Sequence, residues 1–104
     1  MLPADVAGVC ELTVPKAAGQ RRFRVRFTQH YQRVSGTASA DGRTVRLGGA
    51  RLTGDSLEFQ ISERAGATRT ILRFAGRVSG AGMSGTVRSD PGSVHGTWRA
   101  VRRP

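Results

Sequence analysis

The chain has a single cysteine, Cys10, so no disulfide can form within it. Disulfides are typical of secreted domains, and one thiol gives no indication of an oxidising compartment. Residues 1–5 have neither a basic nor an apolar stretch, so we expect an extended lead-in and not a secretory signal. No apolar run approaches the roughly 20 residues of a membrane-spanning helix. We therefore expect a cytoplasmic protein with no membrane partner.

Groups that commonly carry catalysis or bind metals are few. His30 and His95 are the only imidazoles, and with one cysteine they do not complete a four-ligand zinc site. The seven carboxylates fall mostly in expected turns or on expected wet faces, where no apolar setting would raise a pKa for acid–base chemistry. Gly80-x-Gly82-x-x-Gly85 matches a dinucleotide fingerprint by letter but lies in a predicted hairpin. The sequence predicts no catalytic residue, no metal site and no cofactor-binding residue in this chain.

Lysine is almost absent, since Lys16 is the only one, yet the formal net charge is +10. The positive charge is carried by arginines spread from Arg21 to Arg103. A strongly basic chain suggests nucleic-acid binding, but a GC-rich coding bias also enriches arginine, alanine and glycine together. Three interpretations stay open: a generic basic surface, a weak nonspecific polyanion site, and a surface that docks on an acidic protein.

The most regular feature of the chain is alternation with a period of two. Residues 22–27 read Arg-Phe-Arg-Val-Arg-Phe. A strand with this pattern has all its arginines on one face and its bulky apolar side chains on the other. The pattern recurs along the chain between glycine-bearing breaks, whereas no segment shows a helical period. It predicts strands with one dry side and one wet side.

Eight strands are expected in sequence order. The first, second and fourth span residues 6–15, 20–29 and 43–53, and the fourth contains a bend at Gly48-Gly49. Asp41-Gly42 is typical of a type I′ hairpin. The inward parity changes between His30 and Gln32, which indicates a tight turn. Mid-strand glycines such as Gly36 and Gly85 indicate sharp bends or close backbone approaches.

These elements predict an all-β fold, and residues 1–104 form one domain. The expected architecture is a small antiparallel up-and-down (meander) barrel of about eight short strands, lipocalin-like in plan, with no substantial helix. Closing the sheet removes its exposed edges. An open sandwich is the alternative.

Two places could bind a ligand or a partner. Gln29, His30, Tyr31 and Gln32 form the densest polar and aromatic cluster, at a barrel end where loops often carry function; the two glutamines could equally cap strand ends. Trp98 is in phase with the inward residues of the last strand and is expected in the core. Its alternative role is a stacking wall for a small apolar ligand, which the lumen of an eight-stranded barrel can just accommodate.

The outward arginines are the expected docking contacts, and they are Arg22, Arg24, Arg26, Arg73 and Arg77. The phenylalanines and Trp98 are expected to face inward, which leaves only Tyr31 to stack on a base. Binding of nucleic acid would therefore depend on charge alone and be weak and salt-sensitive.

A family resemblance spans nearly the whole chain. Its motifs are Leu2-Pro3-Ala4-Asp5-Val6-Ala7-Gly8, Gln29-x-Tyr31-Gln32, Val34-Ser35-Gly36-Thr37-Ala38, Leu52-x-Gly54-Asp55-x-Leu57-x-Phe59, Gly85-Thr86-Val87 and Trp98-Arg99-Ala100. This succession resembles the β-rich segment that follows the catalytic domain in some bacterial S-adenosylmethionine-dependent methyltransferases. Cys10 stands where that pattern has tryptophan.

The resemblance implies a non-catalytic accessory module that docks beside a catalytic domain and shapes substrate access. The S-adenosylmethionine fold would lie upstream, and no position of these 104 residues matches the family's catalytic or cofactor residues. A free-standing barrel that binds a small apolar ligand, and a charge-driven nucleic-acid accessory, remain the alternatives.

Overall fold

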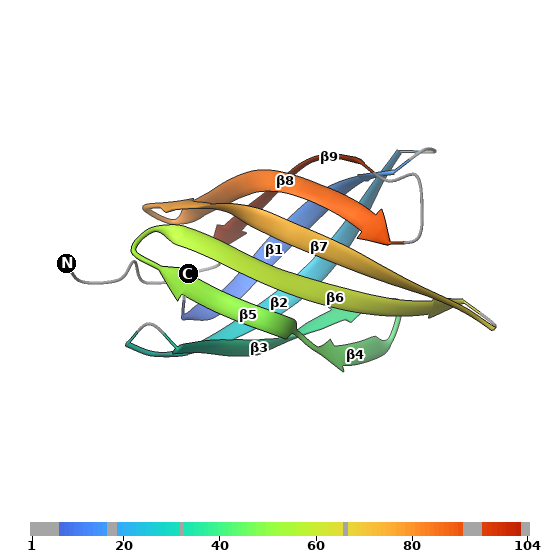
Figure 1. The fold of residues 1–104 in the computed structure, drawn as a ribbon, viewed down its shortest axis with the longest axis horizontal. Helices are drawn as coiled ribbons and strands as arrows, with labels where there is room; N and C mark the ends of the chain where they lie inside the picture. The colour runs from blue at the N-terminus through green and yellow to red at the C-terminus, as the bar shows by residue number, and fades with distance from the viewer. Residues whose placement is uncertain (1–6, 17–18, 32, 66, 91–94, 103–104) are drawn as a thin grey trace.

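The computed structural model describes residues 7–16, 19–31, 33–65, 67–90 and 95–102, and these contain strands and no helix. The nine strands are β1 (Gly8–Lys16), β2 (Gly19–His30), β3 (Arg33–Ala40), β4 (Arg43–Arg46), β5 (Gly48–Thr53), β6 (Ser56–Ala65), β7 (Thr68–Ser79), β8 (Gly82–Asp90) and β9 (His95–Arg102). All their pairings are antiparallel, and they form one strongly curved sheet (Figure 1). The lead-in expected at residues 1–5 lies outside the described residues.

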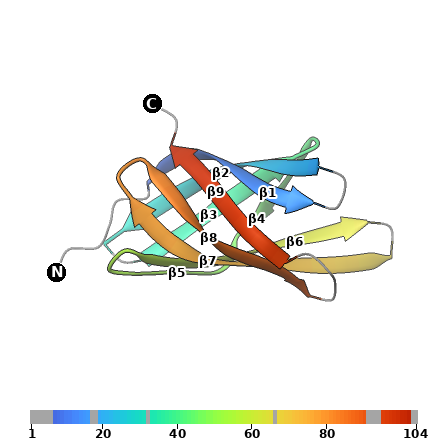
Figure 2. The same cartoon turned by 90° about the horizontal axis from the view of Figure 1, so that it is seen from above.

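The sheet is a meander whose first and last strands lie side by side. Its order is β4-β3-β2-β1-β9-β8-β7-β6-β5, so β1 pairs with β9 and every other pair is consecutive in the chain. Seen from above, the strands curve around a common interior (Figure 2). The predicted small meander barrel is confirmed, and the wall is nearly closed.

The ninth strand arises from the predicted bend in residues 43–53. β4 pairs with β3 and β5 pairs with β6, and the chain turns between them at Gly48 and Gly49, whose φ is 52°. The backbone N–H of Leu47 donates to the carbonyl of Gly36 at 2.9 Å, which ties this bend to β3. One long strand thus changes neighbours at a glycine pair, because a straight strand would not follow the curvature of the wall.

Two predicted turns have the expected geometry. Asp41 and Gly42 both take positive φ, at 52° and 76°, between the paired residues Ala40 and Arg43. This is what a type I′ turn requires. The other turn joins His30 to its partner Arg33 and includes Tyr31 at φ 58°. It accounts for the change of inward parity without a bulge.

The interior is filled by apolar side chains. The buried core residues are Cys10, Leu12, Val14, Phe23, Val25, Phe27, Val34, Ala38, Leu52, Leu57, Phe59, Ile61, Leu72, Phe74, Val78, Met83, Val87, Trp98 and Ala100. Phe59 and Phe74 stack at 4.7 Å between ring centroids, and Trp98 meets their rings edge-on at 5.5 and 5.7 Å. The alternation therefore assigned the dry face correctly wherever the structure describes the side chain.

Mid-strand glycines mark close backbone approaches, as predicted for Gly36 and Gly85. A Cβ on Gly36 would collide with the carbonyl oxygen of Arg26 on the neighbouring strand, and one on Gly85 would collide with that of Ala75. The missing side chain lets the strands bend toward one another there.

Candidate functional site: an arginine-bearing outer face

Three arginines lie in one row across five neighbouring strands. The row, which we call the arginine row, consists of the cross-strand partners Arg22 (β2), Thr13 (β1), Arg99 (β9), Ser84 (β8) and Arg77 (β7). Strands lie about 4.8 Å apart, so arginines on alternate strands are roughly 10 Å apart along the sheet. The backbone ladder holds this spacing, because each member is paired directly with the next.

Most of the charge in the arginine row is uncompensated. Arg77 Nη1 lies 3.3 Å from Asp55 Oδ2, and both side chains are largely exposed. Among the residues that the structure describes, no carboxylate lies within 4 Å of the side-chain nitrogens of Arg22 or Arg99. Two of the three guanidinium groups are therefore available to an acidic partner.

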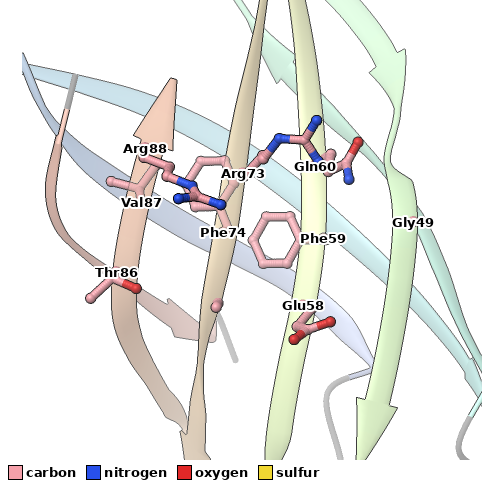
Figure 3. Close-up of a pocket in the computed structure, with 10 residues that line it drawn as sticks. Gly49, Glu58, Phe59, Gln60, Arg73, Phe74, Thr86, Val87 and Arg88 are labelled. Atoms are coloured by element: carbon pink, nitrogen blue, oxygen red, sulfur yellow. The ribbon is translucent and has the colours of Figure 1, made fainter. Parts of the chain in front are cut away.

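A pocket of about 480 Å³ lies beside the arginine row, over the outer face of β6, β7 and β8. We call it the outer groove. Arg73 of β7 and Arg88 of β8 are directly opposite one another in the ladder, and Figure 3 shows their side chains bordering the pocket together with Glu58 and Gln60 from β6. Ala75 also lines the outer groove, and its short side chain fills little of it.

The arginine pair in the outer groove fits an anion. Like charges directly opposite on neighbouring strands are unfavourable, and Arg73 already interacts with another group of the chain. Each guanidinium can donate two parallel hydrogen bonds to a carboxylate or phosphate. Glu58 on the border disfavours a highly charged polyanion there.

The predicted arginine contacts divide over three places. Arg22 and Arg77 belong to the arginine row, and Arg73 belongs to the outer groove. Arg24 and Arg26 are exposed on β2, where Arg24 is paired with Glu11 of β1 in the ladder.

Sequence reasoning missed two residues of this face, Arg88 and Arg99. Alternation indicates that both point outward, because Val87 and Trp98 beside them are expected inward. The structure confirms that Val87 and Trp98 are buried. The register that aligns them with other arginines was not readable from one strand at a time, so no signal marked them as part of a site.

The predicted rim cluster is only partly assembled. Gln29 Nε2 donates to the carbonyl oxygen of Tyr31 at 2.7 Å, so this glutamine caps the turn. The rings of His30 and Tyr31 meet edge-on at 5.1 Å, and Tyr31 is 76% exposed. Gln32 lies outside the described residues. The rim thus offers one exposed aromatic ring and one imidazole, and His30 lines a pocket of about 710 Å³ together with Arg33 and Arg51.

Trp98 is enclosed by the core. It is 2% exposed, and its Nε1 donates to the carbonyl oxygen of Ala75 at 3.2 Å. Phe59 and Phe74 pack against it in the edge-on arrangement described above. A ligand in the lumen would therefore contact Trp98 only after one of these rings moved.

Two further observations describe the chemistry of the chain. The described residues contain no group of three or more His, Cys, Asp or Glu side chains arranged to hold a metal ion. No helix in the described part of the chain is long and apolar enough to cross a membrane.

Cys10 is fully buried on β1, opposite Arg102 of β9. Burial raises the pKa of its thiol above the ordinary 9.0, and the charge of Arg102 offsets part of that rise. Because the thiolate is the reactive form, a buried thiol with a raised pKa is a poor nucleophile.

We expect the stability of the protein to decline at alkaline pH through Cys10. The unfolded chain ionises this thiol near pH 9 while the folded chain keeps it protonated, so the folded state binds more protons and unfolding becomes easier as pH rises. The measurement is the free energy of unfolding of the wild type and of Cys10→Ala between about pH 8 and pH 10. The difference between them should change with pH in this window. A constant difference would contradict the prediction.

The fold and its outer face define a small antiparallel β-barrel with a cationic exterior. Comparisons with protein-family models, with curated proteins and with solved structures found no match to the chain.

Proposed function

We propose that this chain is a non-catalytic accessory module whose arginine row and outer groove dock on an acidic protein surface. The observation that carries the proposal is the register of Arg22, Arg99 and Arg77 on alternate strands of a single ladder row, with two of them lacking an acid partner among the described residues. Thr13 and Ser84 between them add hydroxyl groups that donate and accept hydrogen bonds. A rigid sheet presents this pattern without ordering a loop, which lowers the entropic cost of binding.

A protein partner agrees with this surface better than a nucleic acid does. Binders of single strands display aromatic rings on which bases stack. Here Tyr31 is the exposed aromatic residue of the described chain, and it lies on the β2–β3 turn at a barrel end, away from the row. Nucleic acid would contact only arginines, so its binding would be weak and lost at moderate salt.

The proposed neighbour is the catalytic domain of an S-adenosylmethionine-dependent methyltransferase-like protein. The resemblance in residues 2–8, 29–32, 34–38, 52–59, 85–87 and 98–100 supports this part of the proposal. The cofactor would belong to that neighbour. The natural reading frame tests it: a catalytic region with a glycine-rich cofactor loop should be encoded ahead of the barrel, and a frame that encodes none would contradict it.

A double charge reversal tests the docking surface. In Arg22→Glu/Arg99→Glu, binding to poly-L-glutamate should weaken at least about tenfold, which is about 1.4 kcal/mol, because both uncompensated guanidinium groups of the row are replaced by carboxylates. Fluorescence anisotropy with labelled polymer at about 0.05 and 0.15 M salt measures the affinity and its screening.

The matched control is Arg33→Glu/Arg51→Glu, which makes the same change in net charge at two exposed positions off the row. Its affinity should fall markedly less than that of the row variant. Equal losses in the two variants would show that net charge alone attracts the polymer. Tighter binding to single-stranded DNA than to poly-L-glutamate at the higher salt would also contradict a protein-docking role.

A further inference from the structure

In the described part of the barrel wall, facing strands lack ladder pairing at two places: between the start of β3 and β5, which line a pocket of about 710 Å³, and between β4 and the end of β6. β4 pairs only with β3, and β5 covers β6 only from Ser56 to Gln60. Residues 61–65 of β6 therefore have a backbone ladder partner on the β7 side alone. Figure 2 shows the β6–β7 hairpin diverging from the β3–β4 hairpin at this end. We call this opening between β4 and residues 61–65 the seam.

A pocket of about 640 Å³ occupies the seam. Its inner wall is apolar and includes Phe23, Val45 and Ile61, which belong to the core or pack against it. An unpaired strand edge is a site to which another strand readily adds.

The backbone groups that face the seam are identified by one hydrogen bond. Arg43 Nη1 donates to the carbonyl oxygen of Arg64 at 3.2 Å, so the backbone of Arg64 points toward β4. In an antiparallel strand the N–H and C=O of a residue point to the same side and alternate residues point alike. The backbone groups of Ser62 therefore also face the seam. Here the side chain of Arg43 bridges β4 and β6, in place of a ladder of backbone hydrogen bonds.

The charged side chains at the seam are incompletely satisfied. Arg21 Nη2 lies 2.7 Å from Glu63 Oε1 and 3.4 Å from Asp41 Oδ2. Arg21 Nε and Glu63 Oε1 are covered, yet neither makes a hydrogen bond; the contact is an ion pair whose N–H bonds are not aimed at the oxygen. Covered polar atoms without a hydrogen bond are uncommon in folded proteins.

The seam carries more positive than negative charge. The charged residues that line it are Arg21, Asp41, Arg43, Glu63, Arg64 and Arg69. On its outer side, Arg64 and Arg69 are direct cross-strand partners, and both are exposed. Two carboxylates against four guanidinium groups favour an acidic occupant.

We propose that the seam receives an extended acidic peptide segment of a protein partner, which adds a strand beside β6. Residues 61–65 span about 17 Å at the rise of a strand, so about five residues of the peptide would pair. Alternate side chains point to opposite faces, so an apolar residue would point inward beside the half-buried Val45 while its acidic neighbours lie outside, near Arg64 and Arg69. Backbone pairing supplies the affinity and the alternation supplies the specificity.

The test uses a blocked pentapeptide, Glu-Val-Glu-Val-Glu, and the uniformly labelled protein. Titration should shift the amide resonances of residues 43–46 and 61–65 saturably, and the amide of Ser62 should exchange more slowly with solvent. The same peptide with lysine in place of glutamate should bind at least about tenfold more weakly. Shifts confined to the arginine row, or an equal response to both peptides, would overturn the proposal.

Two variants at one position separate backbone pairing from packing. Ser62→Pro removes the N–H that faces the seam and leaves the N–H groups that face β7, whereas Ser62→Ala keeps that N–H. Both lose the hydroxyl that accepts from Arg69 Nη2 at 3.5 Å. We expect peptide affinity close to the wild type in Ser62→Ala and at least about tenfold weaker in Ser62→Pro. Equal affinities would overturn the proposal.

Two further measurements keep the test decisive if Ser62→Pro does not fold. The first measurement compares two methylated peptides: one carries methyl groups on the backbone nitrogens of both valines, and the other carries them on those of the first and third glutamates. Their affinities should differ, because only one edge of the added strand faces β6. Equal affinities would overturn strand addition. If 1-octanol shifts the seam resonances and the peptide does not, the occupant is a small amphiphile and the proposal fails. The Arg22→Glu/Arg99→Glu variant should bind the peptide as the wild type does, so this outcome is independent of the docking proposal.

Discussion

Replacing Trp98 with alanine is expected to lower the free energy of unfolding by about 3–5 kcal/mol. The indole is 2% exposed and contacts the rings of Phe59 and Phe74 at 5.5 and 5.7 Å between centroids. Truncation removes this contact area and leaves a cavity, because the backbone of a barrel wall relaxes little. A domain of this size has only about 5–15 kcal/mol of stability, so a large share would be lost.

Chemical denaturation measures this effect. The midpoint concentration of urea should fall in Trp98→Ala while the slope of the transition stays near that of the wild type. The control is Trp98→Phe, which keeps a ring in the core but removes the hydrogen bond to the carbonyl of Ala75 and should cost less. A loss below about 1 kcal/mol in Trp98→Ala would show that the tryptophan is not part of the packed core.

Replacing Gly76 with alanine is expected to cost about 3 kcal/mol, at the upper end for overpacking. A Cβ there would lie 2.7 Å from Trp98 Cζ2 and would collide with the carbonyl oxygen of Ser84 on the paired strand. Gly76 is the direct partner of Gly85, and Gly85 is the direct partner of Trp98. Gly76 thus provides space for the indole, and Gly85 allows the close approach of β8 to the backbone of β7.

A control and a double variant identify the cause of the loss. Gly80→Ala places a Cβ where no atom lies within 4 Å, at φ +59°, so it should cost only the left-handed backbone strain of about 1–2 kcal/mol. In Gly76→Ala/Trp98→Ala the clash with the indole is gone, and the summed losses should exceed the measured one by about 1 kcal/mol or more. Strict additivity would show that the glycine does not make room for the tryptophan.

The apolar inner face of the barrel could be predicted from the sequence, because side chains of a strand alternate between its two faces. Phe23, Val25 and Phe27 were assigned inward from their positions alone, and all three are buried. Asp41-Gly42 was readable for a different reason: few dipeptides tolerate two successive positive φ values.

The arginine row could not be predicted from the sequence in the same way. Arg22 and Arg99 are 77 positions apart in the chain and come together because β1 pairs with β2 on one side and with β9 on the other. A shift of one residue in either pairing would break the row, and alternation within one strand carries no information about its partner's register.

The seam could not be predicted from the sequence either, for a different reason. Arg21, Arg43 and Glu63 line one pocket, yet nothing local in the sequence shows that their strands end beside one another. Their meeting depends on the turn at Gly48 and Gly49, which transfers the chain from β3 to β6 and leaves residues 61–65 without a partner on one side.

The order of residues alone determined the secondary structure, the apolar interior and the positions of the sharp turns, because each follows from interactions between near neighbours in the chain. Only the tertiary structure decided which arginines share a row and where the wall stays open. Both depend on the pairing of strands far apart in sequence, and pairing is settled by the closure of the whole sheet around one core.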